Sequence, residues 1–128
     1  MDKKKIYVVD TSYLISRKKL PTSSDIIIPY QVMSEMLSNK MQSQKRLQGR
    51  LCYVIKKLTK MSNVFFQSYK TKQLYHNLFN IHRGDYDGYV LSAALFMKLC
   101  YPFRKVIMLS KDNELNIRCQ LMEIGICV

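Results

Sequence analysis

Four acidic residues that lie far apart in the sequence could do chemistry together. Asp10 ends the run "IYVVD", Glu35 lies in "IIIPYQVMSEML", Asp87 lies in "GDYDGYVLSAA", and Asp112 lies in "VIMLSKDNEL". Carboxylates that are brought together repel and raise one another's pKa unless a positive charge lies between them. Because oxygen ligands without Cys or His favour hard cations, the four acids predict a site for Mg²⁺ or Mn²⁺ rather than for zinc.

Each acid also has a structural explanation that the residues alone leave open. Asp10, Asp87 and Asp112 could each cap a helix, and Glu35 could form a salt bridge. Asp85 could replace Asp87 as the ligand, and Glu114 lies near enough in the sequence to contribute. The whole chain holds only nine acidic residues, so the shared placement of four of them favours the metal site.

The elements that must position these acids follow from hydrophobic periodicity. It predicts five short strands, at residues 6–9, 26–28, 64–67, 106–109 and 126–128. It predicts helices in the stretch after Thr11 and at residues 30–39, 43–60, 71–81, 87–99 and 113–123, with Gly125 ending the last helix. The helix at 43–60 is expected to bury one face, formed by Leu47, Leu51, Val54, Ile55 and Leu58.

Strands that alternate with helices predict a three-layer α/β/α sandwich around a central, mostly parallel sheet of about five short strands. Repeats and Pro/Gly-rich linkers are absent from the sequence, so residues 1–128 are predicted to form a single domain. Asp10 and Asp112 each follow a strand, and both should emerge at the sheet edge where open α/β folds hold ligands. Glu35 and Asp87 lie in the first turns of helices that start at that edge, so the four acids are expected to converge.

The cysteines and the N-terminal segment bear on the compartment. The four cysteines form no C-x-x-C pair and have no accompanying metal-ligand histidines, so neither a disulfide framework nor a zinc site is expected. A reducing, intracellular compartment, the cytoplasm, is therefore predicted. The apolar run before Asp10 is only as long as a strand, so we expect neither a signal peptide nor a spanning helix, and no membrane partner.

The basic charge of the chain indicates the kind of partner. The sequence has 21 Lys and Arg residues and a net charge of +12, which favours a polyanion, usually nucleic acid. The helix at 43–60 carries a stripe that could follow phosphates while its tyrosine stacks on a base; the alternative is a solvated face. The stripe consists of Arg46, Arg50, Tyr53, Lys57 and Lys60, and further basic candidates are Arg17, Lys18, Lys19 and Arg83.

At the four acids the sequence resembles the PIN-domain nucleases, in the branch that includes the PIN modules attached to PhoH-type ATPases and those of RNA-decay endonucleases. "YVVDTSYLI" resembles the opening strand with its D-T-[NS] motif, and Glu35 takes the place of the family's helix glutamate. "DGYVLSAAL" matches the pattern D-x-x-[IV]-L-x-x-A, which favours Asp87 over Asp85. "VIMLSKDNEL" resembles the fourth strand with its [TS]-x-D-x-x-L ending. The matching residues are Asp10, Thr11, Ser12, Asp87, Val90, Leu91, Ala94, Ser110, Asp112 and Leu115.

The resemblance implies a metal-dependent endoribonuclease that hydrolyses phosphodiester bonds of single-stranded RNA with Mg²⁺ or Mn²⁺. Lys111 stands where this branch commonly has Asn, and it is expected to contact the substrate. The alternative is a PIN-type module that binds RNA or protein without cutting. An acidic protein regulator and a second copy of the chain are further partners that the resemblance allows. By resemblance, Asp10, Glu35, Asp87 and Asp112 would be metal ligands and catalytic residues, supported by Ser12, Ser110 and Asp85.

Overall fold

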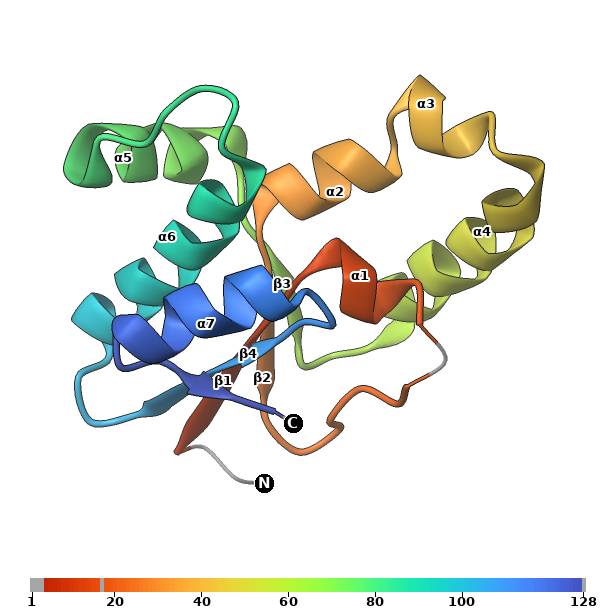
Figure 1. The fold of residues 1–128 in the computed structure, drawn as a ribbon. Coiled ribbons are helices and arrows are strands. Elements are labelled where there is room, and N and C mark those ends of the chain that lie inside the picture. Colours follow the sequence, from red (N-terminus) through yellow and green to blue (C-terminus); the bar gives the residue numbers. More distant parts are fainter. Residues whose placement is uncertain (1–3, 17, 128) are drawn as a thin grey trace.

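The computed structural model describes residues 4–16 and 18–127, and a five-stranded sheet forms its centre (Figure 1). Arg17 and the last residue of the predicted strand at 126–128 lie outside the described residues. The sheet order is β3-β2-β1-β4-β5, and every pairing in it is parallel. The strands are β1 (Lys5–Val9), β2 (Asp25–Ile28), β3 (Val64–Phe66), β4 (Lys105–Leu109) and β5 (Gly125–Ile126).

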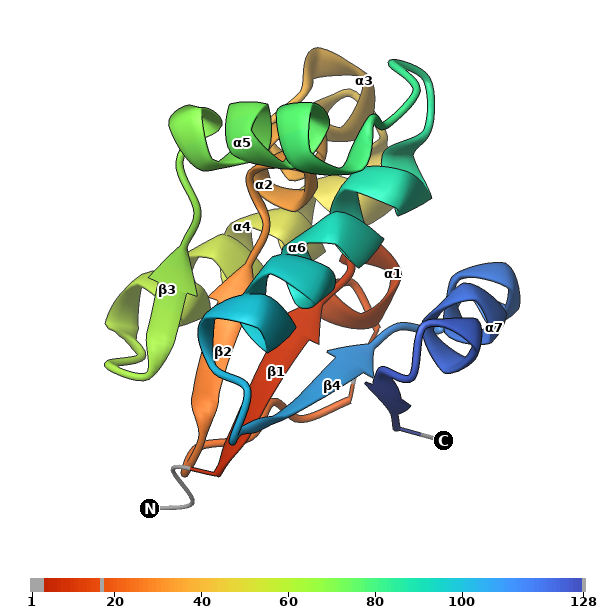
Figure 2. The ribbon, with the colours of Figure 1, turned by 90° about the vertical axis from the view of Figure 1, so that its left-hand side faces the viewer.

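Helices connect the strands and cover both faces of the sheet. Figure 2 shows α6 in front of the strands and α4 behind them, while α5 lies above the ends of the strands. The predicted α/β/α sandwich with its parallel sheet is therefore confirmed. The helices are α1 (Thr11–Leu14), α2 (Tyr30–Met36), α3 (Asn39–Gln42), α4 (Lys45–Lys60), α5 (Tyr69–Phe79), α6 (Tyr86–Cys100) and α7 (Asn113–Leu121).

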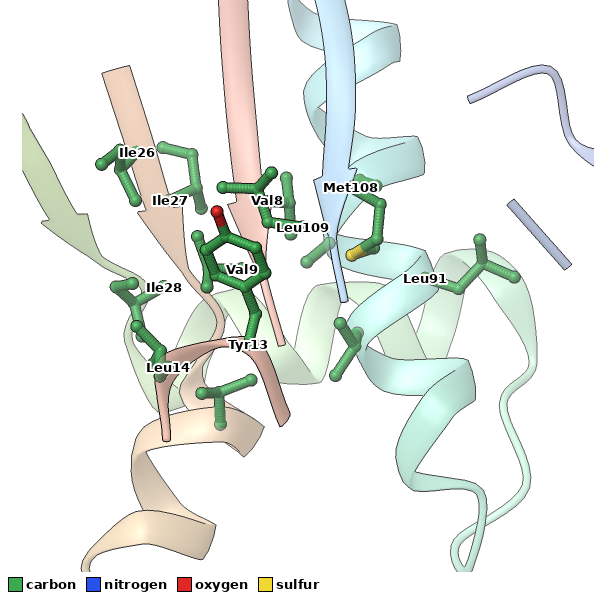
Figure 3. Packing of buried hydrophobic residues seen from close by; sticks show 14 of the residues in the cluster. Val8, Val9, Tyr13, Leu14, Ile26, Ile27, Ile28, Leu91, Met108 and Leu109 are labelled. Atoms are coloured by element: carbon green, nitrogen blue, oxygen red, sulfur yellow. The ribbon is translucent and has the colours of Figure 1, made fainter. Parts of the chain in front are cut away.

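The core forms where apolar strand residues meet the helices on each side. Strands that are covered on both faces read as continuous apolar runs, and the last four residues of β4 are buried in this way. Figure 3 shows Val8, Ile27 and Leu109, from three neighbouring strands, in the buried cluster. The predicted apolar face of α4 is confirmed, because all five of its residues are buried or packed against this cluster. Buried side chains thus pack the strands whose carboxyl ends carry Asp10 and Asp112.

The single helix that we predict at residues 30–39 is wrong, because the structure has two helices there. α2 ends at Met36, and the Ser38 hydroxyl donates to the Glu35 carbonyl and accepts from the Met41 backbone N–H. A serine hydroxyl competes with the helical backbone bonds in this way, so Ser38 ends one helix and caps the next. The turn leads into α3, which the sequence analysis missed.

The predicted helix stop at Gly125 is also wrong. α7 ends at Leu121, Glu123 has a left-handed backbone with φ of 58°, and Gly125 begins β5. The Lys98 ammonium donates to the carbonyls of Met122 and Glu123, which stabilises this turn. The remaining predicted boundaries agree with the structure within two residues. In the described part of the chain, no helix combines the length and the apolar composition needed to cross a membrane.

Candidate active site

The carboxyl ends of β1 and β4 form the edge of the sheet at which the strand order reverses. β1 has β2 on one side and β4 on the other, which is the switch point where open α/β folds bind ligands. The Asp10 N–H donates to the Leu109 carbonyl at 2.9 Å, so the residue after β1 lies directly beside the end of β4. Figure 2 shows the arrows of β1 and β2 pointing toward α1 and α2. The topology therefore brings distant segments to one edge.

A pocket of about 740 Å³ lies at this edge, and we call it the acid pocket. The residues that line it come from the end of β1, from α1, α2, α3 and α6, and from the starts of α4 and α7. The structure thus places all four predicted acids around one space, although they lie far apart in the chain. They are Asp10, Glu35, Asp87 and Asp112.

Asp10 is the most firmly held of these acids. Its side chain is buried, and its Oδ2 atom accepts hydrogen bonds from the hydroxyls of Ser12 at 3.0 Å and Ser110 at 2.9 Å. The same hydroxyls accept from the backbone N–H groups of Lys111 and Asp112, which ties the end of β1 to the turn after β4. Both serines therefore contact an acid, as the supporting role predicted for them requires.

Glu35 and Asp112 each accept hydrogen bonds through one carboxylate oxygen. The Thr11 hydroxyl donates to Glu35 Oε2 at 2.9 Å, and no described cation forms an ion pair with Glu35. Asp112 Oδ1 accepts from the backbone N–H groups of Glu114 and Leu115 and caps α7. Asp112 therefore caps a helix, as its structural explanation predicts, and lines the acid pocket as well. The contact of Thr11 with Glu35 was not foreseen from the sequence.

Asp85 and Asp87 have opposite environments. Asp85 caps α6 by accepting from the Gly88 N–H, and its two oxygens accept from the Arg118 guanidinium at 3.0 Å each. These bonds from Arg118 lower the pKa of Asp85. The structural explanation of Asp87 as the cap is therefore wrong, and Asp85 is occupied by Arg118 rather than facing the acid pocket.

Asp87 forms no hydrogen bond or ion pair with any described residue that would stabilise its charge. Burial raises its pKa to about 6, and repulsion from Asp112 and Asp10 adds to this shift, while Arg118 opposes it. A carboxylate whose charge has no compensating partner is stabilised more by a nearby cation than one that already accepts hydrogen bonds. The contribution of Glu114 is limited to weak repulsion, because this residue is exposed and does not line the acid pocket.

The donor set of the acid pocket fits a hard divalent cation, because it offers carboxylate oxygens and neither thiolate nor imidazole. As the side chains stand, no three His, Cys, Asp or Glu residues of the described chain converge closely enough to hold an ion. Asp87, which is not held by hydrogen bonds, is the acid most free to rotate toward the others. The raised pKa of Asp87 and the chemistry of the donors are both those expected of a site for a divalent cation.

The predicted basic residues differ in their surroundings. Arg50, Tyr53 and Lys57 line a second pocket beside α1, whereas Arg46 and Lys60 are exposed on α4 and line neither pocket. Arg83 belongs to a third pocket, with Tyr69 and His76, and Lys111 is exposed beside Ser12.

Two basic residues of the site were missed by the sequence analysis. Lys40 lines the acid pocket because the turn at Ser38 redirects the chain into α3. Arg118 reaches Asp85 across 33 residues, and only its proximity in sequence to Asp112 could have indicated it.

Comparison with known families gives a match to the PIN domain over residues 7–126. This range includes all four acids of the acid pocket and the serines that hold Asp10. Comparison with curated proteins gives no match. PIN domains are generally nucleases with divalent metals, and the acid pocket has the donors for such an ion. The chain belongs to the PIN-domain family.

Proposed function

We propose that the chain is a Mg²⁺- or Mn²⁺-dependent endoribonuclease that hydrolyses phosphodiester bonds of single-stranded RNA. The observation that carries the proposal is the convergence of Asp10, Glu35, Asp87 and Asp112 on one pocket at the switch point of the sheet. Four carboxylates around one pocket repel one another, and a bound cation would remove this repulsion.

Asp10 would be the principal ligand, because two serine hydroxyls fix its carboxylate at the centre of the sheet edge. Asp87 and Asp112 would complete the ligand set, and Glu35, held by Thr11, would bind a second ion or orient the attacking water. A bound divalent ion supplies activation of water and neutralisation of charge on the leaving oxygen. The protein's own contribution is to hold Asp10, Glu35 and Asp112 by hydrogen bonds, while Asp87 has no competing partner among the described residues.

Metal-dependent cleavage and metal binding can be tested separately with Asp10→Asn. End-labelled single-stranded RNA is incubated with wild type or variant in Mn²⁺, Mg²⁺ or EDTA, and the melting temperature is recorded with and without Mn²⁺. We expect cleavage only by wild type with metal, and a rise in melting temperature that the variant loses, because an ion that binds only the folded state stabilises it. Asn keeps the hydrogen bonds to Ser12 and Ser110, so the variant should fold.

Glu123→Gln is the matched control, because Glu123 is exposed and lies outside the acid pocket. This variant should cleave and bind Mn²⁺ like wild type. Cleavage that survives in EDTA or in Asp10→Asn would contradict the proposal.

The second candidate function is a module that binds RNA or protein without cutting. It is favoured by the arrangement of the acids, no three of which, among the described residues, stand close enough to share an ion. Such a module would bind RNA equally well in Mn²⁺ and EDTA, and Mn²⁺ would leave its melting temperature unchanged. The thermal experiment therefore separates the two candidates without depending on the choice of RNA.

A further inference from the structure

A second pocket, of about 480 Å³, lies between α4 and the segment that follows α1, and we call it the basic pocket. Among the described residues, four cationic side chains line it: Lys18 and Lys19 from that segment, and Arg50 and Lys57 from α4. No described Asp or Glu lines the basic pocket or forms an ion pair with any of these four cations. Positive charge that is left unpaired in a concave site fits an anionic ligand.

The aromatic residues of the basic pocket narrow the chemistry of that ligand. Tyr53 is 67% exposed at the pocket and forms no hydrogen bond with a described residue, so its ring is free to receive another ring. Tyr13 is buried, and its hydroxyl donates to the Lys19 carbonyl at 3.0 Å, which fixes the segment carrying the lysines. Proteins that bind single-stranded nucleic acid combine exposed rings for bases with cations for phosphates. An acidic peptide would use the cations and leave the ring unused.

The basic pocket adjoins the acid pocket through α1 and α4. On α4, Leu47 lines the acid pocket and Arg50 lines the basic pocket, and the two are separated by about 4.5 Å of helical rise. The Arg50 guanidinium donates to the Ile15 carbonyl at 2.8 Å, and Ile15 itself lines the acid pocket. A single strand of nucleic acid that lies in the acid pocket can therefore continue past Arg50 into the basic pocket.

We propose that the basic pocket is a nucleotide-binding subsite for single-stranded RNA. A base of the strand stacks on Tyr53, and its phosphate contacts Arg50, Lys57 and the Lys18–Lys19 segment. The subsite's role in cleavage rests on the proposed function, since it holds the strand whose phosphodiester lies in the acid pocket. Its role in binding does not need a metal.

The test measures binding of a short fluorescent single-stranded RNA in EDTA by anisotropy. The test variant is Tyr53→Ala/Lys57→Ala. The matched control is Lys56→Ala/Phe103→Ala, because Lys56 is an exposed lysine on the same helix outside both pockets, and Phe103 is 97% exposed elsewhere. Stacking and phosphate contact predict that the test variant raises the Kd by about tenfold or more, whereas the control changes it little. Circular dichroism checks that both variants are folded.

Crosslinking supplies a second readout that does not depend on variants. RNA containing thiouridine is irradiated with wild-type protein in EDTA, and the modified peptide is identified by mass spectrometry. The proposal predicts an adduct on the α4 peptide that contains Tyr53. It is overturned if the test and control variants bind alike, or if wild type binds no RNA at low salt. It is also overturned if Tyr53→Ala/Lys57→Ala leaves the affinity for RNA unchanged and Lys57 is needed for binding of a polyglutamate peptide.

The failure of this proposal is distinguishable from that of the proposed nuclease function. Binding is repeated in the Asp10→Asn background, which removes the proposed principal metal-binding carboxylate and leaves the residues of the basic pocket unchanged. If Tyr53→Ala/Lys57→Ala weakens binding there but wild type never cleaves, the subsite stands and the nuclease proposal fails. If wild type cleaves and these substitutions leave binding unchanged, the nuclease proposal stands and the subsite fails.

Discussion

At the residue scale, the acids of the acid pocket differ in how the protein compensates their charge. Asp10 accepts from two buried or half-buried hydroxyls, and Asp112 accepts from the first backbone N–H groups of α7. Asp87 has no such donor among the described residues, and its pKa rises to about 6. Charge left uncompensated at a site costs folding stability, and proteins tolerate this cost where function needs the charge.

Asp87→Asn should therefore stabilise the metal-free protein. A carboxyl whose pKa is raised in the folded state opposes folding when ionised, so the penalty is full above about pH 6 and disappears toward pH 4. We expect a gain of about 1 kcal/mol near neutral pH after allowance for solvent screening, and no gain near pH 4. Urea denaturation of wild type and variant in EDTA, over this pH range, measures the difference.

Asp85→Asn is the matched control with the opposite sign. The Arg118 guanidinium lowers the pKa of Asp85, so its contribution to stability is present at neutral pH and lost as the pH falls through the lowered pKa. We expect a loss on the order of 1 kcal/mol near neutral pH, because the pair is partly solvated. Equal effects of the two substitutions would contradict the distinct environments assigned to Asp85 and Asp87.

At the element scale, the link between α6 and α7 positions one of the acids. The Arg118–Asp85 pair joins the two helices next to the turn of α6 that carries Asp87. Arg118 also lowers the pKa of Asp87, against the larger effect of burial. We therefore regard Arg118 as a positioning residue, which acts on the acid pocket through Asp85 and through its charge.

Arg118→Met should lower cleavage and move its acid limb to higher pH, because removal of the guanidinium raises the pKa of Asp87 further. Initial cleavage rates against pH with Mn²⁺ measure both changes, and Arg118→Lys should restore the pH profile in part. Arg104→Met is the control, since Arg104 forms the corresponding ion pair with Asp25 at the opposite end of the sheet. It should lose similar stability without a shift in the profile. An unshifted profile in Arg118→Met would remove the positioning role.

At the scale of the whole molecule, charge is distributed unevenly. The chain carries a net charge of +12, yet four of its nine acids line one pocket. Next to them, the described residues that line the basic pocket include four cations and no carboxylate. A polyanion would thus be attracted by the molecule as a whole and along the basic pocket, while a cation in the acid pocket would remove local repulsion.

Binding of single-stranded RNA in EDTA should therefore weaken steeply with salt. For single strands, the slope of log K against log salt concentration is about −0.7 for each neutralised phosphate. Anisotropy titrations between about 50 and 200 mM salt give this slope. Lys57→Ala should make it shallower, whereas Lys56→Ala should leave it closer to that of wild type. Salt-independent binding would argue against phosphate recognition.

Most strands and helices, and the candidate acids, could be predicted from the sequence because both depend on local patterns. Runs such as Ile26–Ile28 favour strands, the apolar face of α4 repeats with the helical period, and parallel strands deliver the residues that follow them to one edge. Local patterns predicted helix ends less well. The Ser38 hydroxyl ends a helix that was predicted to continue, and Asp85 rather than Asp87 caps α6.

The contacts between these parts could not be predicted from local patterns and appear only in the folded protein. The strand order puts Ser110 against Asp10, 100 residues away, and folding places Arg118 on Asp85 and Arg50 on Ile15. Folding also places Arg50, Tyr53 and Lys57 of α4 in one pocket with residues that follow α1. Such contacts join residues far apart in the chain, and the free energy that selects them comes from packing of the whole core rather than from the local sequence.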